Sequence, residues 1–374
     1  MFIDYQVAVV GAGIIGASIA AKLASLGVRV ALIDKGTVGS LGASGYSGGL
    51  VRLFDPDPLL MDLAARSIAL LDDAPFANVY TRALRRTGMV YRAAPDQREQ
   101  VERAIGRYAS ARYPMRVLGA DELARFNLGA SDRIDLYEPH ACIGDVRFAT
   151  AALAGLVRRT GLVLEHCELK ALEIRSPKAA HLSVGDMTLR CQAVVIATGA
   201  WSQRWLPQAG LETRSIPLAR VATDKDWSLP VIDAVTHSYG IPLTRTVVQT
   251  GCGVRHMAHM PEDLPLPDAR HAQDACARIE QLSACCQTHV LDVLPGFDGY
   301  SPDGLPLLGF GDAGSPVYLA TGMSGLGFKL APAVAQIAAE QLHARLTGVE
   351  PGQNWSALSP ARLMPSRAIA SAQP

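Results

Sequence analysis

Hydrophobic residues near the start of the chain form two apolar runs, the second interrupted by Arg29 alone, and a stretch with helical spacing separates them. The runs cover residues 7–10 and 28–33, and the stretch between them ends at Leu26, directly before a glycine. Nearly continuous apolar runs are typical of strands buried on both faces, whereas apolar positions about every three to four residues are typical of a helix. The N-terminal segment is therefore predicted to form a strand, a helix and a second strand.

The rest of the chain alternates between helical and strand patterns on both sides of a β-rich middle. Helical spacing predicts helices over 59–73, 97–111, 121–126, 146–160 and 326–346. Apolar or alternating runs predict strands over 162–166, 169–175, 180–184, 187–190, 193–197 and 317–320. Residues 207–295 are rich in β-branched residues and proline and are predicted to be mostly strand. The segment from Gly352 to Pro374 is predicted to be a loosely packed extension.

Strand–helix alternation at both ends of the chain predicts an α/β fold with a doubly wound, Rossmann-like sheet. Because β-rich segments interrupt this pattern, we expect a second domain with a mixed, mainly antiparallel sheet to be inserted into the first. The predicted nucleotide-binding domain consists of residues 1–75, 140–215 and 296–374, and the inserted substrate domain of residues 76–139 and 216–295.

Three glycines mark the junction between the first strand and the first helix, and an acid ends the second strand. Gly11 suits a tight turn, Gly13 lets the backbone approach a pyrophosphate, and Gly16 lets the helix pack close to the strand. The N–H groups at the helix N-terminus favour an anion, and Asp34 can accept the ribose hydroxyls of an adenosine. This order of elements predicts a dinucleotide site, but it does not distinguish NAD from FAD.

Composition and charge disfavour several classes of partner. Of the 374 residues, 49% are hydrophobic and 19% are charged, as in a globular protein with a sizeable core. Basic and acidic residues both number 35, which argues against nucleic acid or an anionic membrane as the main partner. The apolar residues 7–21 lack the preceding positive charge of a secretion signal and are interrupted by glycines. We therefore expect a soluble, cytoplasmic protein without a membrane span.

No metal site is expected from the pattern of cysteines and histidines. The seven cysteines are irregularly spaced, which suits reduced thiols rather than a disulfide framework or a zinc site. His256 and His259 are close in sequence, but no carboxylate motif accompanies them.

Two further glycine-containing segments favour a flavin over a nicotinamide cofactor. The apolar strand 193–197 runs into Thr198 and Gly199, at the end of a strand where doubly wound sheets bind ligands. Near the C-terminus, the glycine-rich residues 322–327 precede a long helix. The N-terminus of that helix can stabilise the negative charge of a reduced flavin.

Five sequence motifs carry a resemblance to a known family. They lie at residues 11–16, 42–49, 197–202, 301–309 and 322–329. In this order they resemble the D-amino-acid oxidase superfamily of FAD-dependent oxidoreductases, and within it the glycine oxidase and sarcosine oxidase group. The resemblance covers nearly the whole chain and implies an FAD that lies between the two domains.

The resemblance also implies which residues bind the cofactor and how. Those residues are Gly11, Gly13, Ile14, Ile15, Gly16, Asp34, Lys35, Ser44, Gly48, Gly49, Leu169, Lys170, Thr198, Gly199, Trp201, Gly325, Leu326, Gly327, Phe328 and Lys329. Gly296 stands where sarcosine oxidases carry a cysteine that links to the flavin, and residues 42–49 contain no histidine. We therefore expect FAD to be bound noncovalently.

For the substrate, Arg52 and Lys329 match positions that hold a carboxylate in sarcosine-oxidase-like enzymes. A guanidinium can bind a carboxylate in bidentate fashion, and an ammonium adds a second charge. The carboxylate-binding arginine of glycine oxidases falls at Asp298, which we interpret either as a group that recognises a substrate ammonium or as a structural acid in a turn. His237, Tyr239 and Tyr300 are further candidates to line the substrate pocket.

The chemistry implied by the resemblance is the oxidation of a C–N bond by hydride transfer to flavin N5, which gives an imine. The leading hypothesis is an FAD-dependent amine or amino-acid oxidase or dehydrogenase with a small-molecule substrate. Two alternatives remain: a tailoring flavoenzyme that acts on a peptide-bound or carrier-bound substrate, and a non-catalytic FAD-binding subunit. Gln249 replaces the lysine with which sarcosine oxidases activate oxygen, so the final electron acceptor stays open.

Overall fold

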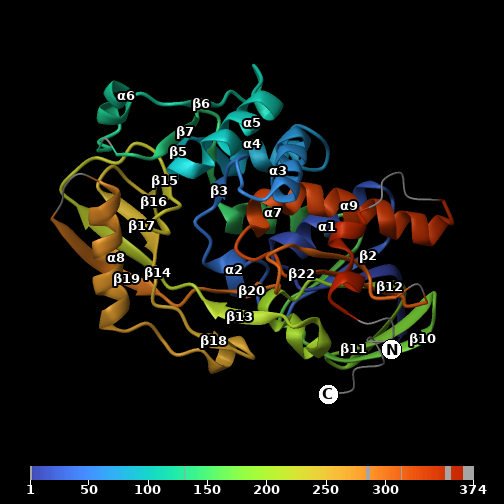
Figure 1. Ribbon diagram of the computed structural model, residues 1–374. Helices are drawn as coiled ribbons and strands as arrows, with labels where there is room; N and C mark the ends of the chain where they lie inside the picture. Colours follow the sequence, from blue (N-terminus) through green and yellow to red (C-terminus); the bar gives the residue numbers. More distant parts are fainter. Residues whose placement is uncertain (1, 130, 284–286, 313, 350–354, 365–374) are drawn as a thin grey trace.

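The protein is built around two eight-stranded sheets that lie beside each other (Figure 1). The computed structural model describes residues 2–129, 131–283, 287–312, 314–349 and 355–364. Five parallel strands form the centre of the first sheet: β9 (Leu162–Leu164), β2 (Val30–Ile33), β1 (Phe2–Val10), β12 (Met187–Ile196) and β22 (Val317–Thr321). Three antiparallel strands extend it: β10 (Leu169–Ser176), β11 (Ala179–Val184) and β21 (Leu307–Phe310).

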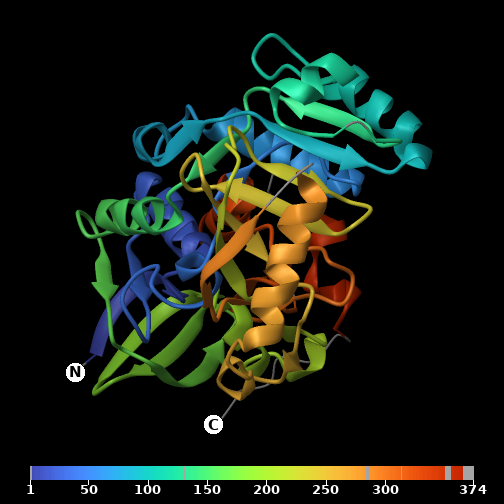
Figure 2. The ribbon, with the colours of Figure 1, turned by 90° about the vertical axis from the view of Figure 1, so that its left-hand side faces the viewer.

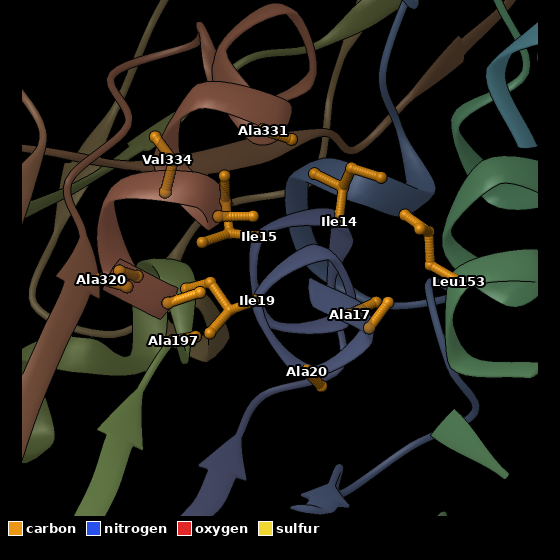
Figure 3. Packing of buried hydrophobic residues seen from close by; sticks show 14 of the residues in the cluster. Ile14, Ile15, Ala17, Ile19, Ala20, Leu153, Ala197, Ala320, Ala331 and Val334 are labelled. Carbon is orange, nitrogen blue, oxygen red and sulfur yellow. The ribbon is translucent and has the colours of Figure 1, made fainter. Parts of the chain in front are cut away.

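The apolar runs of the central strands are explained by burial on both faces. In β1, Val7 and Val9 face one hydrophobic cluster, whereas Ala8 and Val10 face another. Four helices cover the first of these faces: α1 (Ile14–Ser25), α3 (Pro58–Leu70), α7 (Val146–Val157) and α9 (Gly327–Thr347). In Figure 3, Ile15 of α1 points toward Val334 of α9, Ile19 lies beside Ala197 and Ala320, and Ile14 lies on the side of Leu153 of α7. Helix α1 thus packs between α7 and α9.

The second sheet is mainly antiparallel and lies in the middle of the sequence. Its order is β19-β14-β17-β16-β15-β5-β7-β6, and only β15 and β5 pair in parallel. The strands are β5 (Met89–Ala93), β6 (Arg116–Val117), β7 (Ile134–Glu138), β14 (Leu218–Thr223), β15 (Val231–Asp233), β16 (Ser238–Pro242), β17 (Val247–Gly251) and β19 (Thr288–Leu294). Helix α8 (Ala269–Leu282) packs across this sheet (Figure 2). The predicted fold class is confirmed, and the domain boundaries stay a prediction.

Small elements connect the two sheets. Two three-stranded sheets have the orders β18-β13-β20 and β3-β8-β4. These elements are β3 (Leu50–Val51), β4 (Leu84–Arg86), β8 (Cys142–Gly144), β13 (Glu212–Ser215), β18 (Met257–Ala258), β20 (Phe297–Tyr300), α2 (Gly42–Gly45), α4 (Ala77–Ala83), α5 (Arg98–Tyr108) and α6 (Ala120–Arg125). Among the helices of the described residues, none is long and apolar enough to cross a membrane.

Three secondary-structure expectations need correction. Residues 187–190 and 193–197 were expected as separate strands but form the single strand β12, because Arg190 and Gln192 alternate with buried neighbours instead of ending the run. The expected β-rich middle contains helix α8, whose buried residues Ala275, Ile279 and Leu282 recur at helical spacing. Over the whole of residues 207–295, the abundance of β-branched residues and proline outweighed this helical spacing in the prediction.

The C-terminal extension packs more tightly than expected where the structure describes it. Residues 355–364 form two short 3-10 turns, and Leu358 and Met364 are buried in the two clusters that flank the first sheet. These apolar side chains anchor the segment. Residues 352–354 and 365–374 of the predicted extension lie outside the described residues.

Candidate active site

The turn between β1 and α1 brings backbone into very close contact, and only glycine permits it. Gly11 has a φ of 100°, and a Cβ atom at this position would overlap the carbonyl of Ala197, directly after β12. A Cβ atom at Gly16 would overlap the carbonyl of Gly11, so this glycine sets the distance between helix and strand. At Gly13, an added Cβ would lie 3.1 Å from Oγ of Ser44, which also accepts a hydrogen bond from the N–H of Ile14 at 2.9 Å.

Asp34 follows β2 and ties this turn to the neighbouring strand. Its carboxylate accepts hydrogen bonds from the N–H of Ala12 at 2.6 Å and from the N–H of Gly36 at 2.8 Å. Burial raises the pKa of Asp34 above its usual range, although both N–H groups oppose the shift. Beside it, the ammonium of Lys35 lies 4.0 Å from the ring centroid of Trp201.

A cavity of about 390 Å³ begins at this turn and extends to the second sheet. It is lined by most of the residues predicted to bind a cofactor: Gly11, Gly13, Ile14, Ile15, Asp34, Lys35, Ser44, Gly48, Gly49, Leu169, Thr198, Gly199, Trp201, Gly325, Leu326, Gly327, Phe328 and Lys329. Arg52, Tyr239, Asp298 and Tyr300, which were predicted for the substrate, line the same cavity. Gly16 lies behind the turn, where it acts on packing alone.

Two of the predicted site residues lie elsewhere. His237 is exposed and does not line the cavity. Its φ of 51° places it in the turn before β16. The alternation of side chains along β16, which directs Tyr239 into the cavity, therefore does not extend to His237. Lys170 is also exposed, because it follows the buried Leu169 on β10 and successive strand residues face opposite sides. We therefore remove the side chain of His237 from the candidate site. For Lys170 the resemblance implies a contact through the backbone of residues 169–170, and this contact stays a prediction.

Arg52 and Lys329 come together through a residue that the sequence analysis missed. The ammonium of Lys329 donates to a carboxylate oxygen of Asp55 at 2.6 Å, and Nη2 of Arg52 lies 3.6 Å from the same oxygen. The side chains of all three residues are largely buried, with 3% of Lys329, 8% of Asp55 and 11% of Arg52 exposed. Nη1 of Arg52 is buried and has no hydrogen-bond partner among the described residues.

The ionisation of this group follows from its burial and its charges. Burial and the neighbouring Arg52 lower the pKa of Lys329 to about 8, against the opposing effect of Asp55. Burial would raise the pKa of Asp55, but the charges of Lys329 and Arg52 outweigh this effect and lower it. At neutral pH the group therefore contains two cations and one carboxylate, with a net charge of about +1.

Glu138 fixes the segment that carries Asp55. This fully buried carboxylate accepts hydrogen bonds from the N–H of Leu53 at 2.7 Å, the N–H of Phe54 at 3.0 Å and the hydroxyl of Tyr113 at 2.7 Å. Because it ends β7 in the second sheet, Glu138 links the cation group to the edge of that sheet. The sequence offered no local sign of this contact.

Asp298 also accepts backbone hydrogen bonds. One oxygen accepts from the N–H of Gly299 at 2.7 Å, and the other accepts from the N–H of Gly325 at 2.8 Å in the loop before α9. Burial raises the pKa of Asp298 to about 6, and the two N–H groups oppose this shift. These contacts favour the structural interpretation of Asp298, as the residue that holds the glycine loop at the N-terminus of α9.

The comparisons with known proteins agree with this geometry. A family model described as FAD dependent oxidoreductase matches residues 6–341. The chain belongs to this family. Glycine oxidases from Pseudomonas aeruginosa and Pseudomonas putida are each 27% identical to it, over 92% of this chain and 97% and 95% of theirs.

Solved structures share the fold over almost the whole enzyme. L-proline dehydrogenase from P. horikoshii superposes with a TM-score of 0.83 at 20% identity, over 97% of this chain and 98% of that protein. Glycine oxidase from Geobacillus kaustophilus superposes with a TM-score of 0.79 at 22% identity, over 96% of this chain and 99% of that protein. The predicted resemblance is confirmed, and the protein is an FAD-dependent oxidoreductase, so a non-catalytic subunit is excluded.

The residues of the cavity fit FAD. The glycine turn leaves room for a pyrophosphate where a side chain would fill it, and the N-terminus of α1 faces the same space. At the other end, the first N–H groups of α9 have no carbonyl partner within the helix and lie beside the cavity at Gly327 and Phe328. Among the residues that the structure describes, no group of histidine, cysteine and acidic side chains could hold a metal ion.

Proposed function

We propose that the enzyme oxidises the C–N bond of an amino acid or a related amine that carries a carboxylate. The observation that carries this proposal is the buried guanidinium of Arg52, which lines the cavity and has one nitrogen without a partner. A substrate carboxylate at the face of the guanidinium that lines the cavity would balance the net positive charge of the Arg52–Asp55–Lys329 group.

In this proposal each residue has a defined task. Bound FAD would accept the hydride that leaves the substrate carbon, and hydrolysis of the resulting imine would release a carbonyl compound and an amine. Arg52 and Lys329 bind the carboxylate and so orient the reacting carbon, which can contribute several kcal/mol to catalysis. Asp55 keeps both cations in place, and Asp298 holds the loop at Gly325.

Packing at Gly296 supports noncovalent FAD. A Cβ atom at this position would overlap the carbonyl of Ile216 and lie 3.3 Å from Cβ of Tyr46, so the backbone leaves no space for a flavin-linking cysteine. We expect acid precipitation to release FAD into the supernatant. Flavin that stays with the precipitated protein would contradict this part of the proposal.

The identity of the electron acceptor is proposed from Gln249. This residue is buried on β17 beside Gly48 of the cavity wall, and its amide nitrogen has no partner among the described residues. A neutral amide offers no positive charge to favour the reduction of oxygen. We therefore propose a dehydrogenase that passes electrons to an acceptor other than oxygen, and expect slow flavin re-oxidation in air.

Anaerobic flavin reduction tests the main reaction. Amino acids and N-methyl amino acids would be added to the FAD-loaded enzyme, with their methyl esters as matched controls. We expect at least one free acid to bleach the flavin absorbance and its ester to fail. Equal bleaching by acid and ester would contradict the carboxylate-binding role of Arg52, and bleaching only by peptide-bound or carrier-bound substrates would favour the tailoring alternative.

A further inference from the structure

The charged side chains that line the cavity fall into two groups. At the end near Asp34, the cations have acidic partners: Arg204 pairs with Glu168 at 2.8 Å, and Lys35 pairs with Glu262 at 3.2 Å. At the other end, the cavity is lined by Arg52, Lys329, Arg255 and Asp298. The second end is the one where the substrate is proposed to bind.

Arg255 is the cation of this end that the proposed function leaves without a task. It lies between β17 and β18 and is exposed, and among the described residues its guanidinium makes one hydrogen bond, a long one of 3.5 Å from Nε to the carbonyl of Cys252. No carboxylate of the described residues forms an ion pair with it. Asp298 lines the same cavity but forms no ion pair with Arg255, and both oxygens of that carboxylate already accept backbone N–H groups.

The charge of Arg255 is directed at the substrate end of the cavity. Burial raises the pKa values of Tyr239 and Tyr300 above their usual value. The positive charge of the nearby Arg255 opposes this shift at both phenols. Both phenols line the cavity, as does Arg255 itself. Arg52 reaches the cavity from another side, where its guanidinium lies 5.4 Å from the ring centroid of Tyr91 on β5. Two separate cations therefore face one cavity.

From this arrangement we propose that the substrate carries two carboxylates: one binds Arg52 and Lys329, and the other binds Arg255. The substrate class is an amino acid with a second carboxylate on its side chain or on a substituent of its nitrogen. This inference rests on the proposed function. The charges support it, because the Arg52–Asp55–Lys329 group has a net charge that one carboxylate balances, which leaves Arg255 for a second anion.

Ligand binding to the FAD-loaded enzyme tests this inference without turnover. Propionate and glutarate would be titrated, and the change in the flavin absorbance spectrum would give a Kd for each. We expect glutarate to bind at least about 10-fold more tightly than propionate. The variant Arg255→Gln should weaken glutarate about 10- to 100-fold and change the Kd of propionate less than about 2-fold. Arg255→Lys should recover part of the loss.

The matched control is Arg245→Gln, an exposed arginine in the turn between β16 and β17 that pairs with Asp226 and does not line the cavity. It should leave both Kd values unchanged. Equal Kd values for glutarate and propionate in the wild type, or an equal loss of both in Arg255→Gln, would overturn the inference while leaving the carboxylate site at Arg52 intact. Failure of both acids to perturb the flavin would instead contradict the proposed function.

Discussion

The buried pair of Asp55 and Lys329 allows a quantitative prediction about stability. In Asp55→Asn, the ammonium of Lys329 and the guanidinium of Arg52 remain buried near each other without a carboxylate. Removing one partner of a buried ion pair typically costs about 3–5 kcal/mol, because the other charge is left uncompensated. Lysine can escape part of this cost by losing its proton, whereas arginine cannot.

The pKa of Lys329 determines how much of this cost its deprotonation can remove. Its value of about 8 means that the folded protein can deprotonate this lysine for about 1.4 kcal/mol at pH 7 and about 2.8 kcal/mol at pH 6. The contribution of Lys329 to the stability loss is therefore limited to these amounts, and it vanishes above pH 8. The matched control is Asp135→Asn, because Asp135 pairs at 2.8 Å with Arg92 and both side chains are buried. That variant should lose about 3–5 kcal/mol at every pH.

Urea unfolding of the wild type and the two variants at pH 6, 7, 8 and 9 measures the difference. The folded pKa of Lys329 lies below its usual value of 10.5, so the unfolded chain binds more protons between about pH 8 and 10.5. Wild-type stability should therefore gain a contribution from this lysine as pH rises through that window. In Asp55→Asn this gain should begin at a lower pH. Equal and pH-independent losses in both variants would refute the reasoning.

Three further outcomes are expected. Arg52→Ala should lower kcat/KM for carboxylate substrates about 100-fold, or ~3 kcal/mol, in steady-state kinetics, and an unchanged ratio would remove Arg52 from the site. Gly16→Ala should weaken FAD binding and lower the free energy of unfolding in urea by about 1–3 kcal/mol, because the added Cβ would overlap the carbonyl of Gly11. The control Gly155→Ala, where no atom lies within 4 Å of an added Cβ, should be neutral or stabilising. In the folded protein the pKa of Asp298 is about 6, above its usual 3.8. The stability of the wild type should therefore fall by up to about 3 kcal/mol relative to Asp298→Asn as pH rises from 4 to 6. Parallel pH profiles of the two proteins would contradict burial of Asp298 as the cause.

The parts of the site that the sequence predicts well are those governed by local backbone geometry. Gly11 needs a positive φ and a close approach to another strand, and no other residue satisfies both conditions. The motif around Gly325 is of the same kind, since a loop of glycines must precede α9. Such requirements leave a mark on the sequence at the position where they act.

Partners that meet through the tertiary fold leave no such mark. Asp55 binds Lys329 across 274 positions of sequence, and Glu138 binds the backbone of Leu53 from another sheet. The same limit explains the error at His237. Its spacing from Tyr239 suggested a shared face, but the turn at His237 ends the strand geometry on which that inference depends.

The distribution of charge in the cavity connects these separate pieces. Asp55 cancels one of the two cations contributed by Arg52 and Lys329, and the N–H groups of Gly299 and Gly325 occupy the carboxylate of Asp298. Without Asp55, the site would hold two buried cations and would bind one carboxylate only at the cost of an unbalanced charge. With it, the Arg52–Asp55–Lys329 group suits a single carboxylate, and we propose that selectivity for a second acidic group comes from Arg255, which lines the same cavity. On this proposal, the positions of the two arginines, rather than an acid–base pair, would determine which amines the enzyme accepts.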